Sequence, residues 1–226
     1  VVIRNTKLYV NREEGFVGTS LRKDEYVTDC SDIDDIIVFK KDGKMIVTKV
    51  ASKTFVGKDI IHLAVFKKKD TRTVYNMMYR DGKGGASYMK RFSVTGVTRD
   101  KDYDLTLGKS NTMVHYFSAN PNGEAEVVTV LLRAVGSIKK LKWDLDFADL
   151  AVKGRGVRGN TITKFAIRKV EFKSSGVSTL KPRKIWFDDA VQRLNVDARG
   201  ELLGEFRAED KILIATQSGK IKAVTP

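Results

Sequence analysis

The sequence predicts an all-β protein built from repeated hairpins and arranged as a propeller-like disc. Three observations support this fold class. Strand-turn-strand patterns recur along the whole chain, glycine-containing dipeptides recur at a constant interval, and no window of a dozen residues shows a convincing 3.6-residue apolar period. A chain of 226 residues can bury a sizeable core as one all-β domain, so we expect a single unit over 1–226.

The first hairpin is expected over residues 36–50, where two apolar runs flank Asp42-Gly43. Asp-Gly is among the strongest short hairpin signals, because both positions of the tight turn favour a positive φ. The same pattern returns over 74–92, 128–143 and 212–224. A second type of hairpin begins at 7–11 and again at 184–188, which lie 177 residues apart, so the two ends of the chain are expected to be copies of one unit.

Other segments carry weaker signals. Residues 98–107 and 144–152 are expected to be short helices or loops, and 173–178 a loop between two blades.

A 51-residue interval separates Gly57-Lys58 from Gly108-Lys109, and Gly108-Lys109 from Gly159-Asn160. Each dipeptide stands just before a β-rich run, so each marks a loop in the same place of one repeat. Hairpin-rich repeats of 40 to 55 residues are typical of propellers, whose blades are small antiparallel sheets. We therefore expect about five four-stranded antiparallel blades.

The charge balance indicates a polyanionic partner. The chain has 42 Lys and Arg against 28 Asp and Glu, a net charge of +14, and its calculated pI is near 9.7. Such an excess attracts nucleic acid and says little about the fold. Taken singly, each short basic run, Lys90-Arg91 among them, is expected to be a solvated face.

Cysteine and hydropathy patterns indicate the compartment. Cys30 is the single cysteine, so no intramolecular disulfide can form and a reducing compartment is expected. No run of about 18 apolar residues and no signal-type leader is present, so we expect a cytoplasmic protein with no membrane contact. Because the chain opens on Val1 rather than Met, we also expect a fragment of a longer protein.

The glycine-rich basic run 153–160 is the strongest candidate for a binding loop. Glycines let the backbone approach a phosphate closely, and Arg155 and Arg158 can each offer a fork of donors. We expect phosphate contacts to duplex DNA without base readout, since the chain has neither a recognition helix nor a zinc-finger pattern. The candidate DNA-binding residues are Lys40, Lys41, Lys44, Lys58, Lys109, Lys139, Lys140, Lys153, Arg155, Gly156, Arg158, Gly159, Lys181, Arg183, Lys220 and Lys222.

No catalytic residue and no metal site are predicted. His62 and His115 each lie inside an apolar strand pattern, at corresponding places of successive repeats, which indicates a packing role. Cys and His do not cluster with zinc spacing, and the Gly-x-Ser-x-Gly and phosphate-loop motifs are absent. Residues 154–159 match G-x-G-x-x-G, but a strand-like run follows where a dinucleotide site needs a helix. We expect no cofactor in this domain.

Four segments together carry a family resemblance: the hairpins 36–50 and 212–224, the segment 152–163 and the run 14–21. They resemble the C-terminal domain of the A subunit of bacterial type IIA DNA topoisomerases, the family of DNA gyrase and topoisomerase IV. The resemblance covers nearly the whole chain. It implies a β-pinwheel, a disc whose blades exchange strands with their neighbours, with duplex DNA bent around a basic perimeter.

Gyrases of this family carry the box Q-[RK]-R-G-G-[RK]-G in the first blade. Its closest counterpart here is 153–159, where Arg155, Gly156, Arg158 and Gly159 match and the other three positions differ. This counterpart lies in the second half of the chain. The resemblance therefore implies topoisomerase IV-type relaxation and decatenation, with DNA wrapping for negative supercoiling by gyrase as the alternative.

The resemblance also implies where the chemistry lies. The catalytic tyrosine and the metal-binding carboxylates belong to other domains of such enzymes, so none of the seven tyrosines here takes that role. ATP and Mg²⁺ bind elsewhere in the parent enzyme, which pairs two A subunits with two B subunits. The domain itself is expected to be monomeric, in a bacterial cytoplasm and associated with the nucleoid.

Two rival functions remain open from the sequence. A propeller that binds other proteins would explain the repeats but not the charge. An RNA-binding β-protein would explain the charge but should expose pairs of aromatic side chains for base stacking. Tyr75, Tyr79 and Tyr88 alternate with apolar residues, which indicates packing instead.

Overall fold

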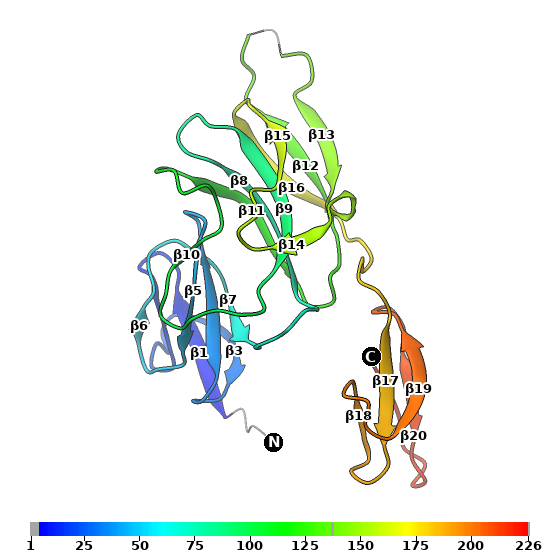
Figure 1. Ribbon diagram of the computed structural model, residues 1–226. Helices are drawn as coiled ribbons and strands as arrows, with labels where there is room; N and C mark the ends of the chain where they lie inside the picture. Colours follow the sequence, from blue (N-terminus) through cyan, green and yellow to red (C-terminus); the bar gives the residue numbers. More distant parts are fainter. Residues whose placement is uncertain (1–4, 137, 226) are drawn as a thin grey trace.

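The structure is a computed structural model that describes residues 5–136 and 138–225. The described residues form 21 strands in six sheets, and the single helical turn among them is the 3-10 element η1 (Phe147–Asp149). The all-β prediction is therefore confirmed. Four sheets form one body, and two small sheets stand apart from it at the end of an extended connection (Figure 1).

The first sheet has the strand order β3-β1-β2-β6. Its strands are β1 (Thr6–Asn11), β2 (Phe16–Gly18), β3 (Glu25–Cys30) and β6 (Thr54–Phe55). Along β1, Leu8 and Val10 are buried and alternate with partly exposed residues, as expected for a strand with one face in the core.

The second sheet has the order β10-β5-β4-β7. Its strands are β4 (Asp35–Lys40), β5 (Lys44–Lys49), β7 (Ile60–Phe66) and β10 (Tyr103–Asp104). The expected hairpin around Asp42-Gly43 is confirmed, and Gly43 takes the positive φ of 84° that its turn requires. Every residue of β4 is buried, because this sheet is covered on both faces.

The third sheet has the order β11-β8-β9-β14, and β15 also pairs with β9. Its strands are β8 (Val74–Arg80), β9 (Ser87–Ser93), β11 (Met113–Asn120), β14 (Val152–Gly154) and β15 (Asn160–Thr163). The β14–β9 pair is parallel, whereas the β15–β9 pair is antiparallel.

The fourth sheet completes the body, with the order β13-β12-β16. Its strands are β12 (Val127–Leu132), β13 (Lys142–Asp146) and β16 (Ile167–Ser174). Val128 and Val130 of β12 are fully buried and pack with Met78 of β8 and Phe147 of η1, so the fourth sheet shares a core with the third.

Strand exchange links the first three sheets of the body. β6 follows the β4–β5 hairpin in the chain, yet it pairs back with β2 of the first sheet through Phe16 opposite Phe55. In the same way β10 follows β9 but pairs back with β5, through Tyr103 opposite Met45. We call β6, β10 and the β14–β15 pair the exchange strands; they cover sheet edges that would otherwise be open.

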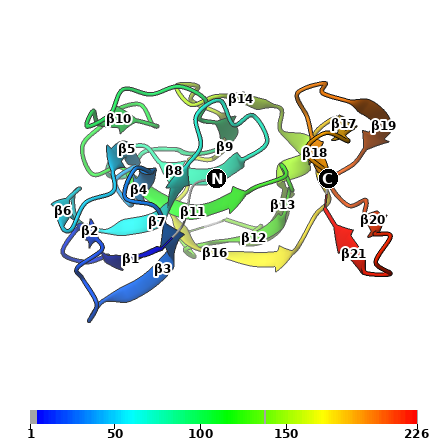
Figure 2. The same ribbon diagram turned by 90° about the horizontal axis from the view of Figure 1, so that it is seen from below.

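The C-terminal unit consists of the fifth and sixth sheets. The fifth has the order β18-β17-β19, and the sixth is the hairpin β20–β21. Figures 1 and 2 both show this unit to one side of the body. Its strands are β17 (Arg183–Asp188), β18 (Arg193–Asn195), β19 (Glu201–Phe206), β20 (Ile212–Ala215) and β21 (Ile221–Val224).

The sheet sizes differ from the expected five blades of four strands. Two sheets have four strands, one has five, two have three and one has two, within the described residues. β1 and β17 share a pairing pattern, because each pairs with the next two strands along the chain, and the interpretation of the two ends as copies of one unit stays a prediction. The segments 98–107 and 144–152 contain β10 and η1 and are otherwise mostly irregular. A single unit over 1–226 stays a prediction.

Candidate nucleic-acid interface

The basic loop comprises residues 155–159 and connects β14 to β15. β14 runs parallel to β9 with Lys153 opposite Phe92, and β15 returns antiparallel with Asn160 opposite Met89. Both ends of the basic loop are thus fixed to one strand, so the loop crosses the stretch of β9 that contains Lys90. The sequence predicted the loop, but its reversal over β9 comes from the exchange-strand pairing.

Lys90 holds the inner side of the basic loop. Its Nζ donates hydrogen bonds to the carbonyl oxygens of Arg155 at 2.6 Å, Val157 at 2.9 Å and Leu105 at 2.5 Å. The Tyr79 hydroxyl donates to the carbonyl oxygen of Arg158 at 2.8 Å. Three carbonyl groups of the basic loop therefore point into the protein.

The outer side of the basic loop presents backbone N–H groups. No cis peptide bond occurs among the described residues, and in a trans peptide the N–H points away from the C=O. Because the carbonyls of Arg155 and Val157 face Lys90, the amide groups of Gly156 and Arg158 face outward. An added Cβ at Gly156 would meet no atom within 4 Å, so the space outside this peptide is open.

The two arginines of the loop are supported by tyrosine rings. Arg155 donates from Nη1 to the carbonyl oxygen of Gly96 at 2.7 Å, and its guanidinium carbon lies 4.4 Å from the centre of the Tyr103 ring. The Arg158 guanidinium carbon lies 5.4 Å from the centre of the Tyr88 ring. A ring contact restricts a guanidinium without using its in-plane donors, so the donors of Arg158, and those of Arg155 that Gly96 does not occupy, stay open to an anion.

Gly159 is required by the backbone at the end of the loop. Its φ is 93°, a value that side chains disfavour. A Cβ there would lie 2.4 Å from the carbonyl oxygen of Met89 and 2.8 Å from Cβ of Lys90. Gly159 therefore lets the chain pass close over β9.

The Lys90 ammonium is buried, and this burial affects its pKa. The side chain is 3% exposed, and burial lowers its pKa to about 8 despite the opposing effect of the Asp104 carboxylate. Its neighbour Arg91 is 2% exposed and donates to Asn76, Thr179, Gly123 and Glu124. Lys90 and Arg91 were expected to lie on a solvated face, and that expectation is wrong, since β9 is covered on both faces by the fourth sheet and the basic loop.

Several other candidate lysines are engaged within the protein. Lys40 is 7% exposed under the Gly57 loop, and its Nζ lies 3.0 Å from the Asp102 carboxylate. The Lys40 side chain is therefore largely withdrawn from the surface and paired with an exposed carboxylate, and its contact with DNA stays a prediction. Lys109 is exposed, but its Nζ lies 3.1 Å from the buried carboxylate of Asp81.

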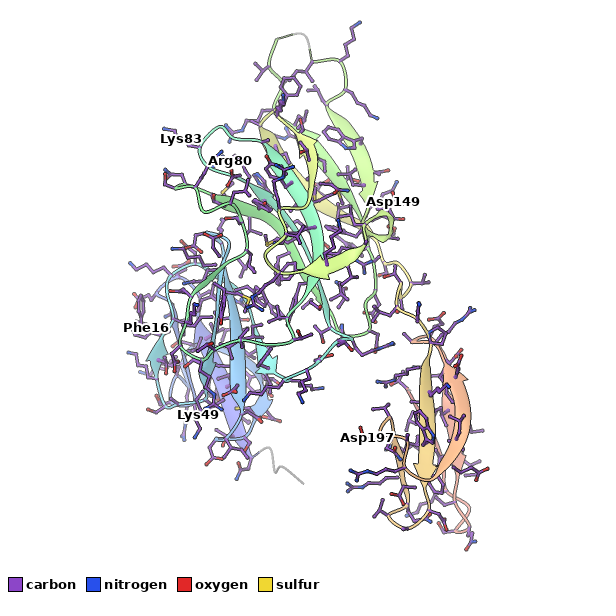
Figure 3. The ribbon with its side chains drawn as sticks, viewed as in Figure 1. Phe16, Lys49, Arg80, Lys83, Asp149 and Asp197 are labelled. Carbon is purple, nitrogen blue, oxygen red and sulfur yellow. The ribbon has the colours of Figure 1, made fainter. Side chains whose placement is uncertain are left out.

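The remaining candidates are spread over the surface. Lys41 and Lys44 flank the β4–β5 turn, Lys58 follows β6, and Lys139 and Lys140 precede β13. All of these are exposed, as are Lys153 and Gly156. Four lie on or just before the C-terminal unit, whose position Asp197 marks in Figure 3, and of these only Arg183 is partly buried. Those four are Lys181, Arg183, Lys220 and Lys222.

The residues that shape the loop carry only a weak signal in the sequence. Tyr79 and Lys90 lie within β8 and β9, and Tyr103 lies in a two-residue strand. The available signal was the position of Lys90-Arg91 between apolar residues of a strand, which is unusual for a solvated pair. Figure 3 labels Arg80 and Lys83 at the β8–β9 turn and Asp149 in η1, on either side of this part of the body.

The two histidines pack inside the body. Burial lowers the pKa of His62 to about 4 and that of His115 to about 4, so both are neutral near pH 7. His62 lies among the rings of Phe39, Tyr75 and Phe117. Within residues 5–136 and 138–225, no group of His, Cys, Asp and Glu side chains could hold a metal ion. Nor does that part of the chain contain a helix long and apolar enough to cross a membrane.

Exchange strands, hairpin sheets and a glycine-rich arginine loop define this molecule as a β-pinwheel domain. Its sequence matches the family described as Topoisomerase C-terminal domain, Bacteroidota, over residues 7–174 and 193–226. The chain belongs to this family.

The proteins similar to this chain include a curated relative and a solved structure. The A subunit of DNA topoisomerase 4 from Borreliella burgdorferi (strain ATCC 35210 / DSM 4680 / CIP 102532 / B31) is 28% identical over 174 residues, which are 76% of this chain. The matched region is 26% of that relative, so the chain spans about a quarter of its length. The crystal structure of the C-terminal domain of DNA topoisomerase IV aligns with 100% of this chain and 85% of its own, at a TM-score of 0.49 and 12% identity.

Proposed function

We propose that this domain binds duplex DNA and bends it around its basic surface, as the accessory domain of a type IIA topoisomerase A subunit. The observation that carries the proposal is the basic loop. Its carbonyls face Lys90 and Tyr79, whereas the amides of Gly156 and Arg158 face outward beside two ring-supported guanidiniums. Amide and guanidinium donors gathered on one surface loop suit a phosphate.

Binding of this kind is driven by charge and is nearly neutral to sequence. Each neutralised phosphate releases condensed counterions, so the affinity falls steeply as salt rises. The proposed contacts go to phosphates and not to base edges. Bending a site of 20–30 base pairs by 40–90° costs about 1–6 kcal/mol, which further phosphate contacts on Lys41, Lys44, Lys58 and Lys153 help to offset.

The domain contributes geometry to a reaction performed elsewhere in its enzyme. The curved duplex is presented as a segment for ATP-dependent strand passage, and ATP and Mg²⁺ bind to other domains or subunits. We infer an A₂B₂ enzyme of the topoisomerase IV type in the bacterial cytoplasm, acting in relaxation and decatenation. The departure of Lys153, Gly154 and Val157 from the gyrase box supports this type over the gyrase alternative.

The basic loop is tested by replacing Arg155 and Arg158 with Ala together. The fold should survive, because neither side chain belongs to the buried core. Affinity for a duplex of about 30 base pairs should fall roughly tenfold or more, and the slope of log affinity against log salt should flatten by about 2, close to 0.9 per lost phosphate contact. Energy transfer between dyes at the two DNA ends should report a smaller bend.

The matched control replaces Arg22 and Arg168 with Ala, two exposed arginines outside the loop. It removes the same charge and should lose only a small, general part of the affinity. Equal losses in the two double variants would show that net charge, and not the loop, binds DNA. An affinity that is indifferent to salt, or a preference for single strands, would overturn duplex binding altogether.

The enzyme type is tested in the parent enzyme. Deleting this domain should weaken decatenation and relaxation by the assembled A₂B₂ enzyme. Loss of an ATP-dependent negative supercoiling activity on deletion would instead assign the domain to a gyrase.

A further inference from the structure

The ammonium group of Lys90 lies inside the protein, where carbonyl oxygens hold it. Among the described residues no ion pair involves Lys90, although its side chain is 3% exposed. Removing a charged group from water is costly unless hydrogen bonds replace the lost hydration. An ammonium group has three N–H donors, and here each has one carbonyl acceptor, so all three are satisfied.

The three acceptors come from two segments that are far apart in the chain. Leu105 follows the exchange strand β10, which completes the second sheet, while Arg155 and Val157 belong to the basic loop. Lys90 itself lies in β9 of the third sheet, and its Nζ is 4.8 Å from the centre of the Phe92 ring. One buried cation thus joins two sheets and the loop at a single point.

We propose that Lys90 is the positioning residue of the DNA-binding loop, a proposal that rests on the function inferred above. Its ammonium keeps the carbonyls of Arg155 and Val157 turned inward, and it thereby keeps the following amides turned toward the phosphate. Lys90 does not touch DNA, because the loop covers it. Its influence on DNA passes entirely through the orientation of the peptides at Gly156 and Arg158.

Replacing the ammonium group with an apolar group would leave backbone carbonyl groups without their hydrogen-bond donor. With a methyl-ended side chain, three carbonyl oxygens lose this donor, and the two that belong to the basic loop, those of Arg155 and Val157, each stay buried at a cost or turn toward water. A peptide that turns presents a carbonyl oxygen to the phosphate in place of an N–H, which repels the anion. Tyr79 restrains the next peptide through the Arg158 carbonyl, so its hydroxyl makes a second, weaker tie.

The experiment compares Lys90→Met with Lys83→Met, which removes an exposed lysine from the β8–β9 turn. In the DNA-free protein, amide exchange at 155–159 should become faster in Lys90→Met and stay unchanged in Lys83→Met. Affinity for a duplex of about 30 base pairs should fall about tenfold in Lys90→Met and less than about twofold in the control. Lys90→Arg retains a cation and should recover most of both properties.

A double-mutant cycle separates positioning from a general loss of structure. In the Arg155→Ala/Arg158→Ala background, Lys90→Met should weaken DNA binding by much less than in the wild type, because the donors it orients have been removed. Full additivity of the losses in DNA affinity would overturn the proposal. So would an amide exchange rate at 155–159 that stays unchanged in Lys90→Met, or a Lys90→Arg variant that behaves like Lys90→Met. If Lys90→Met does not fold, Tyr79→Phe replaces it, with faster exchange at Gly159 and about threefold weaker binding expected.

These outcomes distinguish the two proposals. Wild-type DNA affinity in Lys90→Met, together with a loss in Arg155→Ala/Arg158→Ala, would refute the positioning role alone. Wild-type affinity in Arg155→Ala/Arg158→Ala would refute the proposed function of the loop. The amide exchange rates at 155–159 in the DNA-free protein would then still decide whether Lys90 orders the loop.

Discussion

The body and the C-terminal unit carry similar basic turns on very different supports. In the body, Arg155 and Arg158 extend from a loop tied to β9 at both ends. In the C-terminal unit, Lys220 and Lys222 lie on or beside a two-stranded hairpin, and within 183–224 only Ile185 is buried. Positive charge alone therefore does not define a binding site here. A basic residue acquires a fixed position only where exchange strands and a shared core lie behind it.

The first and fifth sheets show where this difference begins. Both are built around a central strand, β1 or β17, that pairs with the next two strands of the chain. In the first sheet the exchange strand β6 covers the outer edge of β2. No strand among the described residues pairs with the corresponding edge of β18. The same local pattern thus gives a buried sheet in one case and an exposed sheet in the other.

The largest effect is expected from Phe39→Ala in the body. Phe39 is 1% exposed, and its ring centre lies 4.6 Å from those of both Tyr75 and Phe117. Truncation leaves a cavity that the surrounding sheets cannot close, so the free energy of unfolding should fall by about 3–5 kcal/mol. Urea titration followed by tyrosine and tryptophan fluorescence measures this change. A loss below about 1 kcal/mol would mean that the body is no better packed than the C-terminal unit.

An intermediate loss of stability is expected when the pH is lowered, and it should come from His62 in the body. The folded-state pKa of His62 is about 4, below the ordinary value of 6.5, so between these values the unfolded chain binds more protons than the folded one. Stability therefore falls as pH falls through this window. His62→Phe should remove about 2 kcal/mol of the loss between pH 7 and about pH 4.5. Urea titrations of both proteins at several pH values measure this, and parallel curves would contradict a buried neutral His62.

The smallest effect is expected from Leu213→Ala in the C-terminal unit. Leu213 is 69% exposed in β20, so its truncation opens no cavity. The change in the free energy of unfolding should lie within about 0.5 kcal/mol. A loss of more than about 2 kcal/mol would show that this face is covered in solution, and the contrast with the body would then disappear.

Local sequence signals predicted the hairpins but not the connections between sheets. Asp42-Gly43 and Asp81-Gly82 each close a turn by local backbone chemistry, which a short window of sequence reveals. The exchange strands β6 and β10 are two residues long and pair with partners 39 and 58 positions earlier in the chain, as Phe55–Phe16 and Tyr103–Met45. Such pairing depends on tertiary packing, which no window can show.

For the candidate site, the sequence likewise predicted the local loop but not the packing around it. The glycines and arginines of 155–159 are visible in the sequence, because their chemistry lies in their own residue types. The burial of Lys40 and Lys90 was missed, since a lysine in an apolar strand looks the same whether a loop covers it or water does. The constant 51-residue spacing also concealed that the three glycines do not occupy the same place in the fold. Gly57 and Gly108 follow their exchange strands, whereas Gly159 lies between β14 and β15.

The exchange strands impose an order on synthesis. As the chain leaves a ribosome, the first sheet lacks an edge until Phe55 emerges, by which time the β4–β5 hairpin is already outside. The second sheet likewise waits for Tyr103 and the third for residues up to Thr163. Each of the first three sheets is therefore finished only after the next hairpin has appeared, so these sheets overlap in time as they form and none of the three matures alone.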